Sequence, residues 1–462
     1  MSVIQICYIL SAILFILGIR SLSSPETARR GMHLAALGML IAIVGTLFNH
    51  EIVTYTWIVA GLVLGTLLSI PISLRIPMTK IPQRIALSHA GGALAACLIG
   101  IAEYYRYNAT IGHVSMGIIA VEVVLAALTV TGSLVVAGKL HGFLPGRPIT
   151  YRGQNIVNLA LFAVMIGLLI YTVIYPTMNI TFYVLLTLAF ALGIFLVTPI
   201  GAADMPVVIA IFNAYGGLTG AVMGFMLGNR LQIITGALDG ASGFILAILM
   251  CRAMNRSITN VFFGAFGKVD KDADKKISTN DNRQAQSVDI EEALLFFDEA
   301  KSVIVVPGYG MAASQAHHAL REFADKLKGK GINVKYAIHP VAGRMPGHMN
   351  VLLAEANVPY TDLFDMDDIN PEFSHADVVL VVGANDVTNP SARTVKSSPI
   401  YGMPILDVDQ AKKIIVVKRS MDPGFSGVEN ELYFKDNTWM LFGDAKDSLS
   451  KLSYGFKRGW GG

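Results

Sequence analysis

The chain has 462 residues, of which 53% are hydrophobic and only 15% are charged, and its formal net charge is +3. This composition excludes an ordinary soluble protein and predicts a membrane protein. The small net charge provides no basic surface for a polynucleotide, so no nucleic-acid partner is expected.

Apolar blocks of about 20 residues fill the first part of the chain, and each is long enough to cross roughly 30 Å of hydrocarbon. They lie at 3–20, 31–48, 52–70, 84–101, 114–138, 156–175, 181–199, 205–227 and 231–251. No positive charge precedes the first block, which is typical of a retained anchor and not of a cleaved signal. The sequence therefore predicts a polytopic α-helical domain of about nine transmembrane helices over residues 1–262, set in a lipid bilayer.

Positive residues follow the odd-numbered spans. These residues are Arg20, Arg29 and Arg30, then Arg75, Lys80 and Arg84, then Lys139, Arg147 and Arg152, and finally Arg252 and Arg256. Because cytoplasmic loops carry an excess of Lys and Arg, the N-terminus is expected outside and the C-terminal part in the cytoplasm.

A polar, charged segment follows the last span and predicts a linker over residues 263–289. Its Asp270, Asp272 and Asp274 have the spacing of a calcium loop, but Lys275 occupies the position where such a loop needs Gly. The three cysteines, Cys7, Cys97 and Cys251, all lie in apolar segments without metal-ligand spacing. No bound metal is expected.

Residues 290–462 alternate short β-branched runs with longer mixed segments, which predicts a soluble α/β Rossmann-like domain with a parallel sheet. The predicted strands are VIVV (303–306), VKYAI (334–338), VVLVV (378–382) and IIVV (414–417). A crossover helix is expected to begin inside the motif that follows the first strand. Its apolar face would contain Ala316, Leu320, Phe323 and Leu327, and it would end at Gly329.

The first strand runs into Gly308-x-Gly310-x-x-Ala313, the order of residues that a dinucleotide-binding turn requires. The glycines would permit a tight turn and a close approach of a phosphate. No acidic residue follows the second strand to hold a ribose hydroxyl, and Arg344 lies close behind it. This favours NADP(H) over NAD(H).

Several longer segments resemble the β subunit of bacterial proton-translocating NAD(P) transhydrogenases. They are GYGMA (308–312), HPVAGRMPGHMNVLLAEA (339–356), GANDVTNP (383–390), YGMPILDV (401–408), KRSMDPGFSGVEN (418–430), MLFGDAK (440–446) and, in the membrane part, GAADMPVVIAIFNAYGG (201–217). The resemblance implies a Si/Re-specific enzyme of the bacterial inner membrane, assembled as a dimer of alpha-beta units. NADP(H) would be bound by this chain in reversed orientation, and NAD(H) by an alpha subunit.

The resemblance also implies which residues contact NADP(H). They are Gly308, Tyr309, Gly310, Val341, Ala342, Gly343, Arg344, Met345, Pro346, Gly383, Ala384, Asn385, Asp386, Val387, Gly402, Met403, Lys418, Arg419, Ser420, Met421, Asp422, Pro423, Gly424, Phe425, Asp444 and Ala445. Independently of the resemblance, Lys418 and Arg419 are adjacent cations directly after a buried strand, where they suit a 2′-phosphate. Phe425 stands where the family usually has Tyr.

A hydride transfer needs two nicotinamides, yet the chain has one fingerprint, so a partner chain with an NAD(H) domain is expected. Inward proton passage, at about 2.3 kcal/mol per charge per 100 mV, would drive the reaction. His89 is the leading proton-path residue because imidazole exchanges protons near neutral pH and small residues share its helix face. The resemblance adds Asn213 and Asp204.

Glu122 lies on a small-polar helix face, where a proton-path role and a structural pairing are equally favoured. The role of Asp239 stays open. Two rival functions remain: a nucleotide-gated ion transporter, for which no filter or paired carboxylates are found, and an NADPH dehydrogenase that reduces quinone. The second needs a flavin or iron–sulfur site, and no cysteine pattern supports one.

Overall fold

The computed structural model describes residues 3–22, 25–48, 52, 54–75, 77, 80–107, 111–146, 148–201, 204–255, 257–263, 284–345, 347–396, 398, 400–424 and 426–458. Most of the predicted linker, together with Pro346 and Phe425, lies outside these residues. The chain divides into two compact units. The first comprises Met1–Ala137, Tyr151–Val197 and Ala210–Ile245, and the second comprises Gly138–Thr150, Thr198–Ile209 and Leu246–Gly462.

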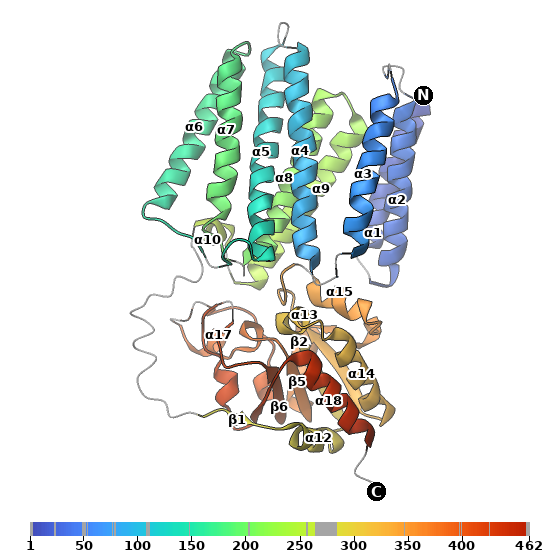
Figure 1. Ribbon diagram of the computed structural model, residues 1–462, viewed down its shortest axis with the longest axis vertical. Helices are drawn as coiled ribbons and strands as arrows, with labels where there is room; N and C mark the ends of the chain where they lie inside the picture. The colour runs from blue at the N-terminus through green and yellow to red at the C-terminus, as the bar shows by residue number, and fades with distance from the viewer. Residues whose placement is uncertain are drawn as a thin grey trace. The chain divides into compact units, whose positions relative to one another are not determined.

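Every predicted span coincides with a long helix in the described part of the chain (Figure 1). Eight of these helices are long and apolar enough to cross a membrane, and in the ninth, α3, the apolar stretch covers Thr56–Pro71. The helices are α1 (Val3–Ser21), α2 (Pro25–Leu47), α3 (Thr56–Arg75), α4 (Ile81–Tyr107), α5 (His113–His141), α6 (Gln154–Ile174), α7 (Asn179–Val197), α8 (Met205–Met226) and α9 (Arg230–Ala253). A short helix, α10 (Ile258–Phe263), follows.

Glycines let α8 and α9 approach closely. A Cβ at Gly224 would lie 2.7 Å from the backbone nitrogen of Ile233, and one at Gly236 would lie 2.6 Å from the carbonyl oxygen of Gly217. Among the described residues, nothing lies within 4 Å of a Cβ built at Gly216. The contact face therefore includes Gly217 and Gly224, whereas Gly216 points away from α9.

The C-terminal residues form a seven-stranded, wholly parallel sheet in the order β1-β7-β6-β5-β2-β3-β4. Its strands are β1 (Gln286–Ser287), β2 (Ser302–Pro307), β3 (Asn333–Ile338), β4 (Leu363–Asp365), β5 (Val378–Val382), β6 (Lys413–Lys418) and β7 (Thr438–Phe442). Leaving aside the edge strand β1, this is the strand order of a doubly wound dinucleotide-binding fold. The predicted fold class is confirmed, while β1, β4 and β7 are additions.

Alternate residues of each central strand enter two different cores. Val303 and Val305 of β2 pack beneath α12 (Ile290–Asp298), α14 (His317–Gly329) and α18 (Ala445–Arg458). Ile304 and Val306 pack on the other face, with residues of shorter segments (Figure 1). The short elements of this part are α13 (Tyr309–Ala313), α15 (His348–Glu355), η3 (Tyr360–Asp362), α16 (Met366–Ile369), η4 (Asn370–His375), η5 (Asp386–Thr388), α17 (Ser391–Thr394), η6 (Val408–Gln410) and η7 (Glu431–Phe434).

The first crossover differs from the predicted single helix. It begins inside the motif as α13, stops, and resumes as α14. Gln315 between them has φ +53°, and the Ser314 hydroxyl donates to the carbonyl of Gly310 at 2.9 Å, which ends the first helix. The predicted apolar face is nonetheless buried, and the helix ends at Gly329 as expected.

Candidate nucleotide site and polar residues of the helices

The strands β2 and β5 end side by side at the point where the strand order reverses, which is where ligands bind in doubly wound sheets. The loops after them are hydrogen-bonded to each other. The Gly308 nitrogen donates to Val382 at 2.9 Å, and the Gly310 nitrogen donates to Gly383 at 2.8 Å. A Cβ at Gly310 would lie 2.6 Å from the Gly383 Cα, and Gly383 itself has φ +68°. Glycine is therefore needed at these positions because two loops cross closely there. The fingerprint alone indicates only the tight turn and the close approach of a phosphate.

A cleft opens at this edge of the sheet. Of the predicted contact residues, those that line it are Gly308, Tyr309, Gly310, Val341, Ala342, Gly343, Gly383, Ala384, Asn385, Asp386, Val387, Met403, Lys418, Pro423 and Gly424. Ile400 also lines it, although only its place beside the 401–408 segment could have indicated this. Outside this lining lie Arg344, Met345, Gly402, Arg419, Ser420, Met421, Asp422, Asp444 and Ala445.

Asn385 is fixed in the cleft by its oxygen and leaves its amide nitrogen unused. Its Oδ1 accepts from the Tyr433 hydroxyl at 3.0 Å and from the Asn430 Nδ2 at 3.2 Å. Its buried Nδ2 has no hydrogen-bond partner among the described residues. Because a buried donor without an acceptor is unfavourable, this nitrogen is suited to donate to a ligand.

Asp386, next to it, faces the segment after β6. The Ser426 hydroxyl donates to its Oδ1 at 2.6 Å, and the Ser426 nitrogen donates to its Oδ2 at 3.0 Å. Burial raises the pKa of Asp386, against the opposing effects of Ser426 and Lys418. The carboxyl group thus anchors one wall of the cleft to the other.

Lys418 and Arg419 follow one another in extended chain and point to different neighbours. The Lys418 ammonium lies 5.0 Å from the centre of the Tyr433 ring and donates to the carbonyl of Asp422. Burial lowers its pKa, while Asp422 and Asp386 oppose this. Arg419 is exposed and pairs with Asp444 at 2.8 Å. Of the two cations, Lys418 is the one that lines the cleft.

The loop after β3 is held by two neutral histidines. Nδ1 of His339 accepts from the Val341 nitrogen at 3.2 Å, so its Nε2 carries the proton and donates to the Pro404 carbonyl at 2.8 Å. Nδ1 of His348 accepts from the Arg344 nitrogen at 2.9 Å. Burial lowers the pKa of each imidazole to about 4.

Arg344 lies over Tyr309, with its guanidinium carbon 4.2 Å from the ring centre. This contact joins the loop after β3 to the motif after β2. Arg344 therefore orders the aromatic wall of the cleft in addition to any contact with a ligand.

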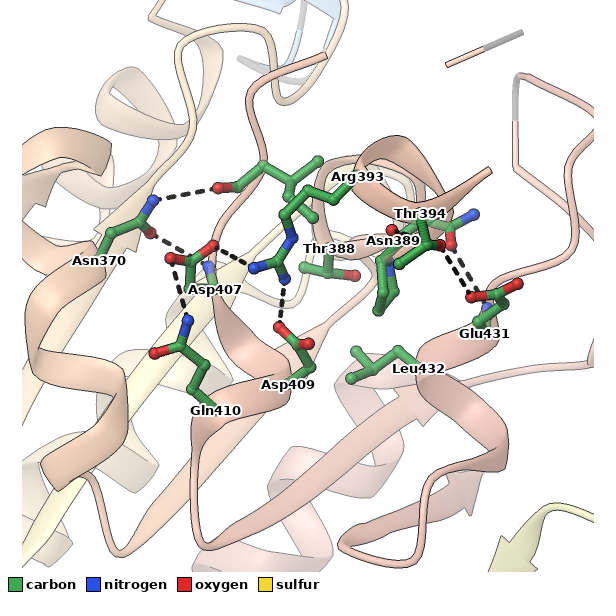
Figure 2. A network of polar contacts seen from close by, with 12 residues as sticks. Asn370, Thr388, Asn389, Arg393, Thr394, Asp407, Asp409, Gln410, Glu431 and Leu432 are labelled. Atoms are coloured by element: carbon green, nitrogen blue, oxygen red, sulfur yellow. Dashed lines mark hydrogen bonds and ion pairs between the residues drawn. The ribbon is translucent and has the colours of Figure 1, made fainter. Parts of the chain in front are cut away.

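A polar network holds the segment that contains Ile400 and Met403 (Figure 2). Arg393 of α17 lies 3.2 Å from Asp407 and 2.5 Å from Asp409. The Asp407 nitrogen donates to Oδ1 of Asn370 at 3.1 Å. These contacts fix both ends of the segment that carries Ile400 and Met403 into the cleft.

Among the membrane helices, three polar residues come together. His89 of α4 lies near Asn213 on α8 and Asp239 on α9, and its buried Nδ1 has no hydrogen-bond partner among the described residues. The Asn213 Nδ2 donates to Oδ1 of Asp239 at 3.0 Å. The structure thus gives Asp239 a partner, whereas its role was open in the sequence.

The other two predicted proton-path residues are Asp204 and Glu122. Asp204 is fully buried directly before α8. Glu122 is fully buried on α5, and neither carboxylate oxygen has a hydrogen-bond partner among the described residues. A Cβ at Gly100 of α4 would lie 3.4 Å from Oε1 of Glu122.

Comparison with known proteins identifies relatives over nearly the whole chain. The family model described as "NAD(P) transhydrogenase beta subunit" matches residues 4–454. The chain is also similar to the NAD(P) transhydrogenase subunit beta of Rhodospirillum rubrum, with 46% identity over 458 residues and 98% of each chain covered. The same protein from a defined strain of that species gives the same figures.

Proposed function

Since this chain belongs to the family of NAD(P) transhydrogenase beta subunits, we propose that it binds NADP(H) in the cleft between the β2 and β5 loops. There it would exchange hydride with NAD(H) held by an alpha subunit. The observation that carries the proposal is the cleft itself, which lies at the switch point of the sheet and contains a buried amide donor that has no acceptor among the described residues. NADP(H), when bound, would supply the nicotinamide that gives or accepts the hydride.

The residues of the cleft then have distinct tasks. The Asn385 Nδ2 donates to the nucleotide, and the crossed glycine loops bring the backbone of both loops to the wall of the cleft. The Lys418 ammonium faces the 2′-phosphate, which NADP(H) has and NAD(H) lacks. Tyr309, which packs against Arg344, forms the aromatic wall. No acid or base is needed at the reacting atoms, because direct hydride transfer requires only proximity and orientation.

The helices would couple this reaction to inward proton movement. The group formed by His89, Asn213 and Asp239 supports this, because ionisable residues among apolar spans mark proton relays. We place the enzyme in a bacterial inner membrane as a dimer of alpha-beta units. The N-terminus would lie outside and residues 290–462, which carry the sheet, in the cytoplasm. Residues 263–289 would form the linker. The positive charges after the odd-numbered spans support this orientation.

Nucleotide selectivity tests the cleft assignment. In the full chain, Lys418→Gln should weaken NADPH binding about 10- to 100-fold, because a hydrogen bond to a charged group is worth about 1.5–3 kcal/mol. NADH binding should change much less. The matched control, Lys446→Gln, replaces an exposed lysine outside the cleft and should leave both affinities unchanged. Calorimetry that shows an equal effect on NADH and NADPH, or no effect, would refute the assignment.

A further inference from the structure

Two histidines and a glutamate lie close together outside the nucleotide cleft, and the proposed function assigns them no task. His317 and His318 open α14, and Glu355 closes α15. Each offers one ligand atom, and these three atoms lie within 4.8 Å of one another. The two imidazole rings are 4.4 Å apart between centroids. Within the described part of the chain, none of the three residues lines the nucleotide cleft.

The buried member of this cluster is His317, which is only 4% exposed. Its Nδ1 forms no hydrogen bond with a described residue, and its Nε2 faces Glu355. An imidazole nitrogen without a proton is the form that ligates metal ions.

The spacing of the ligand atoms fits coordination to one ion. Nε2 of His317 lies 3.4 Å from Oε2 of Glu355. Two atoms that are each about 2.1 Å from Zn²⁺ at a tetrahedral angle are separated by roughly 3.4 Å. His318 and Glu355 are exposed, so an ion can enter from solvent and keep a water ligand.

We propose that His317, His318 and Glu355 form a site for Zn²⁺ or a similar divalent transition metal, with a water at the open position. Two imidazoles and one carboxylate suit such an ion better than Mg²⁺ or Ca²⁺, which prefer oxygen ligands. The ion would join the start of α14 to the end of α15, the two helices that follow the motif and the loop after β3. No cysteine or histidine spacing in the sequence indicated it, because Glu355 is supplied by a different helix.

The experiment compares metal binding by the tag-free full chain with that of His318→Gln and Glu355→Gln. His375→Gln, which replaces an exposed histidine of η4, is the matched control. After removal of metal with a chelator, each protein is titrated with Zn²⁺. The wild type and the control should each bind one ion per chain more tightly than the two variants. The difference in Zn²⁺ affinity should exceed roughly tenfold, because even mutation of a residue that only hydrogen-bonds to a metal ligand lowers metal affinity about that much.

Two further measurements separate binding from folding. Co²⁺ should give the wild type and the control a visible absorption band that the two variants lack. Added Zn²⁺ should raise the Tm of the wild type and the control only, because an ion bound to the folded state stabilises it. Without metal, all four proteins should have the same Tm, since the replaced side chains are exposed. Equal Zn²⁺ affinity, equal Co²⁺ spectra, or no Zn²⁺ binding in the wild type would overturn the proposal.

Discussion

Polar side chains are arranged differently in the sheet unit and among the membrane helices. Around the cleft they form connected networks, in which Asn385 bonds Tyr433 and Asp386 bonds Ser426. Among the helices, Thr129 and Thr172 donate to backbone carbonyls of their own helices, and Glu122 has no hydrogen-bond partner within the described residues. A helix satisfies its own backbone groups, so it does not depend on such a side chain to stay folded. Substitutions in the helices should therefore affect coupling alone, whereas substitutions at the cleft should affect geometry and binding together.

The largest effect is expected at His89. His89→Ala removes a group able to accept and release protons, and such groups contribute about 10²- to 10⁴-fold to the rate. Proton-coupled turnover in vesicles should fall by at least about 10²-fold, while NADP(H) binding stays the same. His33→Ala, on the exposed surface of α2, is the matched control. Retained proton pumping in His89→Ala would remove this residue from the coupling path.

The second effect is a loss of stability at acid pH, and it is expected in the C-terminal part that carries the sheet. Burial lowers the pKa of His339 to about 4, below the value of about 6.5 in an unfolded chain. Between these values the unfolded state binds more protons, so stability is full above pH 6.5 and is lost as the pH falls towards 4. The loss should reach about 3 kcal/mol.

Thermal unfolding of the full chain between pH 7 and 4 measures this loss. His339→Gln should flatten the pH dependence, while His375→Gln should not. An unchanged slope in His339→Gln would mean that other groups cause the acid sensitivity.

The third effect tests the crossed loops. Gly383→Ala places a Cβ 2.5 Å from the Met311 nitrogen, in a backbone conformation that L residues rarely adopt. Strain of this kind costs about 1–3 kcal/mol, so both the Tm and the affinity for NADP(H) should fall. In the control, Gly329→Ala, no described atom lies within 4 Å of the new Cβ. Equal behaviour of the two variants would contradict the close approach of the loops.

The smallest effect is expected at Tyr433. Tyr433→Phe removes the hydroxyl that positions Asn385, at a cost of about 1 kcal/mol, which is a several-fold loss of NADP(H) affinity. Tyr360→Phe, at an exposed ring, is the control. Titration of both variants measures the change, and an equal affinity would show that Asn385 does not need this support.

Features carried by local hydrophobic pattern could be predicted from the sequence. The nine spans and the strands β2, β3, β5 and β6 are apolar runs in the chain itself, so periodicity and length were enough. The strands β1 and β4 have only two and three residues and no such signal. Strand β7, with Thr438, Trp439 and the exposed Phe442, has a mixed composition that was not identified as a strand.

Features that depend on a neighbouring element could not be predicted. The sequence does not show whether Gly216 or Gly217 faces the neighbouring helix, and only the position of α9 distinguishes them. Asp239 accepts a hydrogen bond from Asn213 on another helix, and the Gln315 turn divides a helix whose apolar face is continuous in sequence. At the cleft, the motif predicts a tight turn at Gly308 and Gly310, but the contact of these glycines with Gly383 depends on the fold.

Tracing the hydride itself tests the central claim most directly. Membrane vesicles that contain this chain, with or without an alpha subunit, are given NADP⁺ and NADH deuterated at the nicotinamide C4. Deuterium should reach NADPH without exchange with water, and only when both chains are present. Deuterated NADPH formed by this chain alone, or loss of the label to solvent, would contradict it.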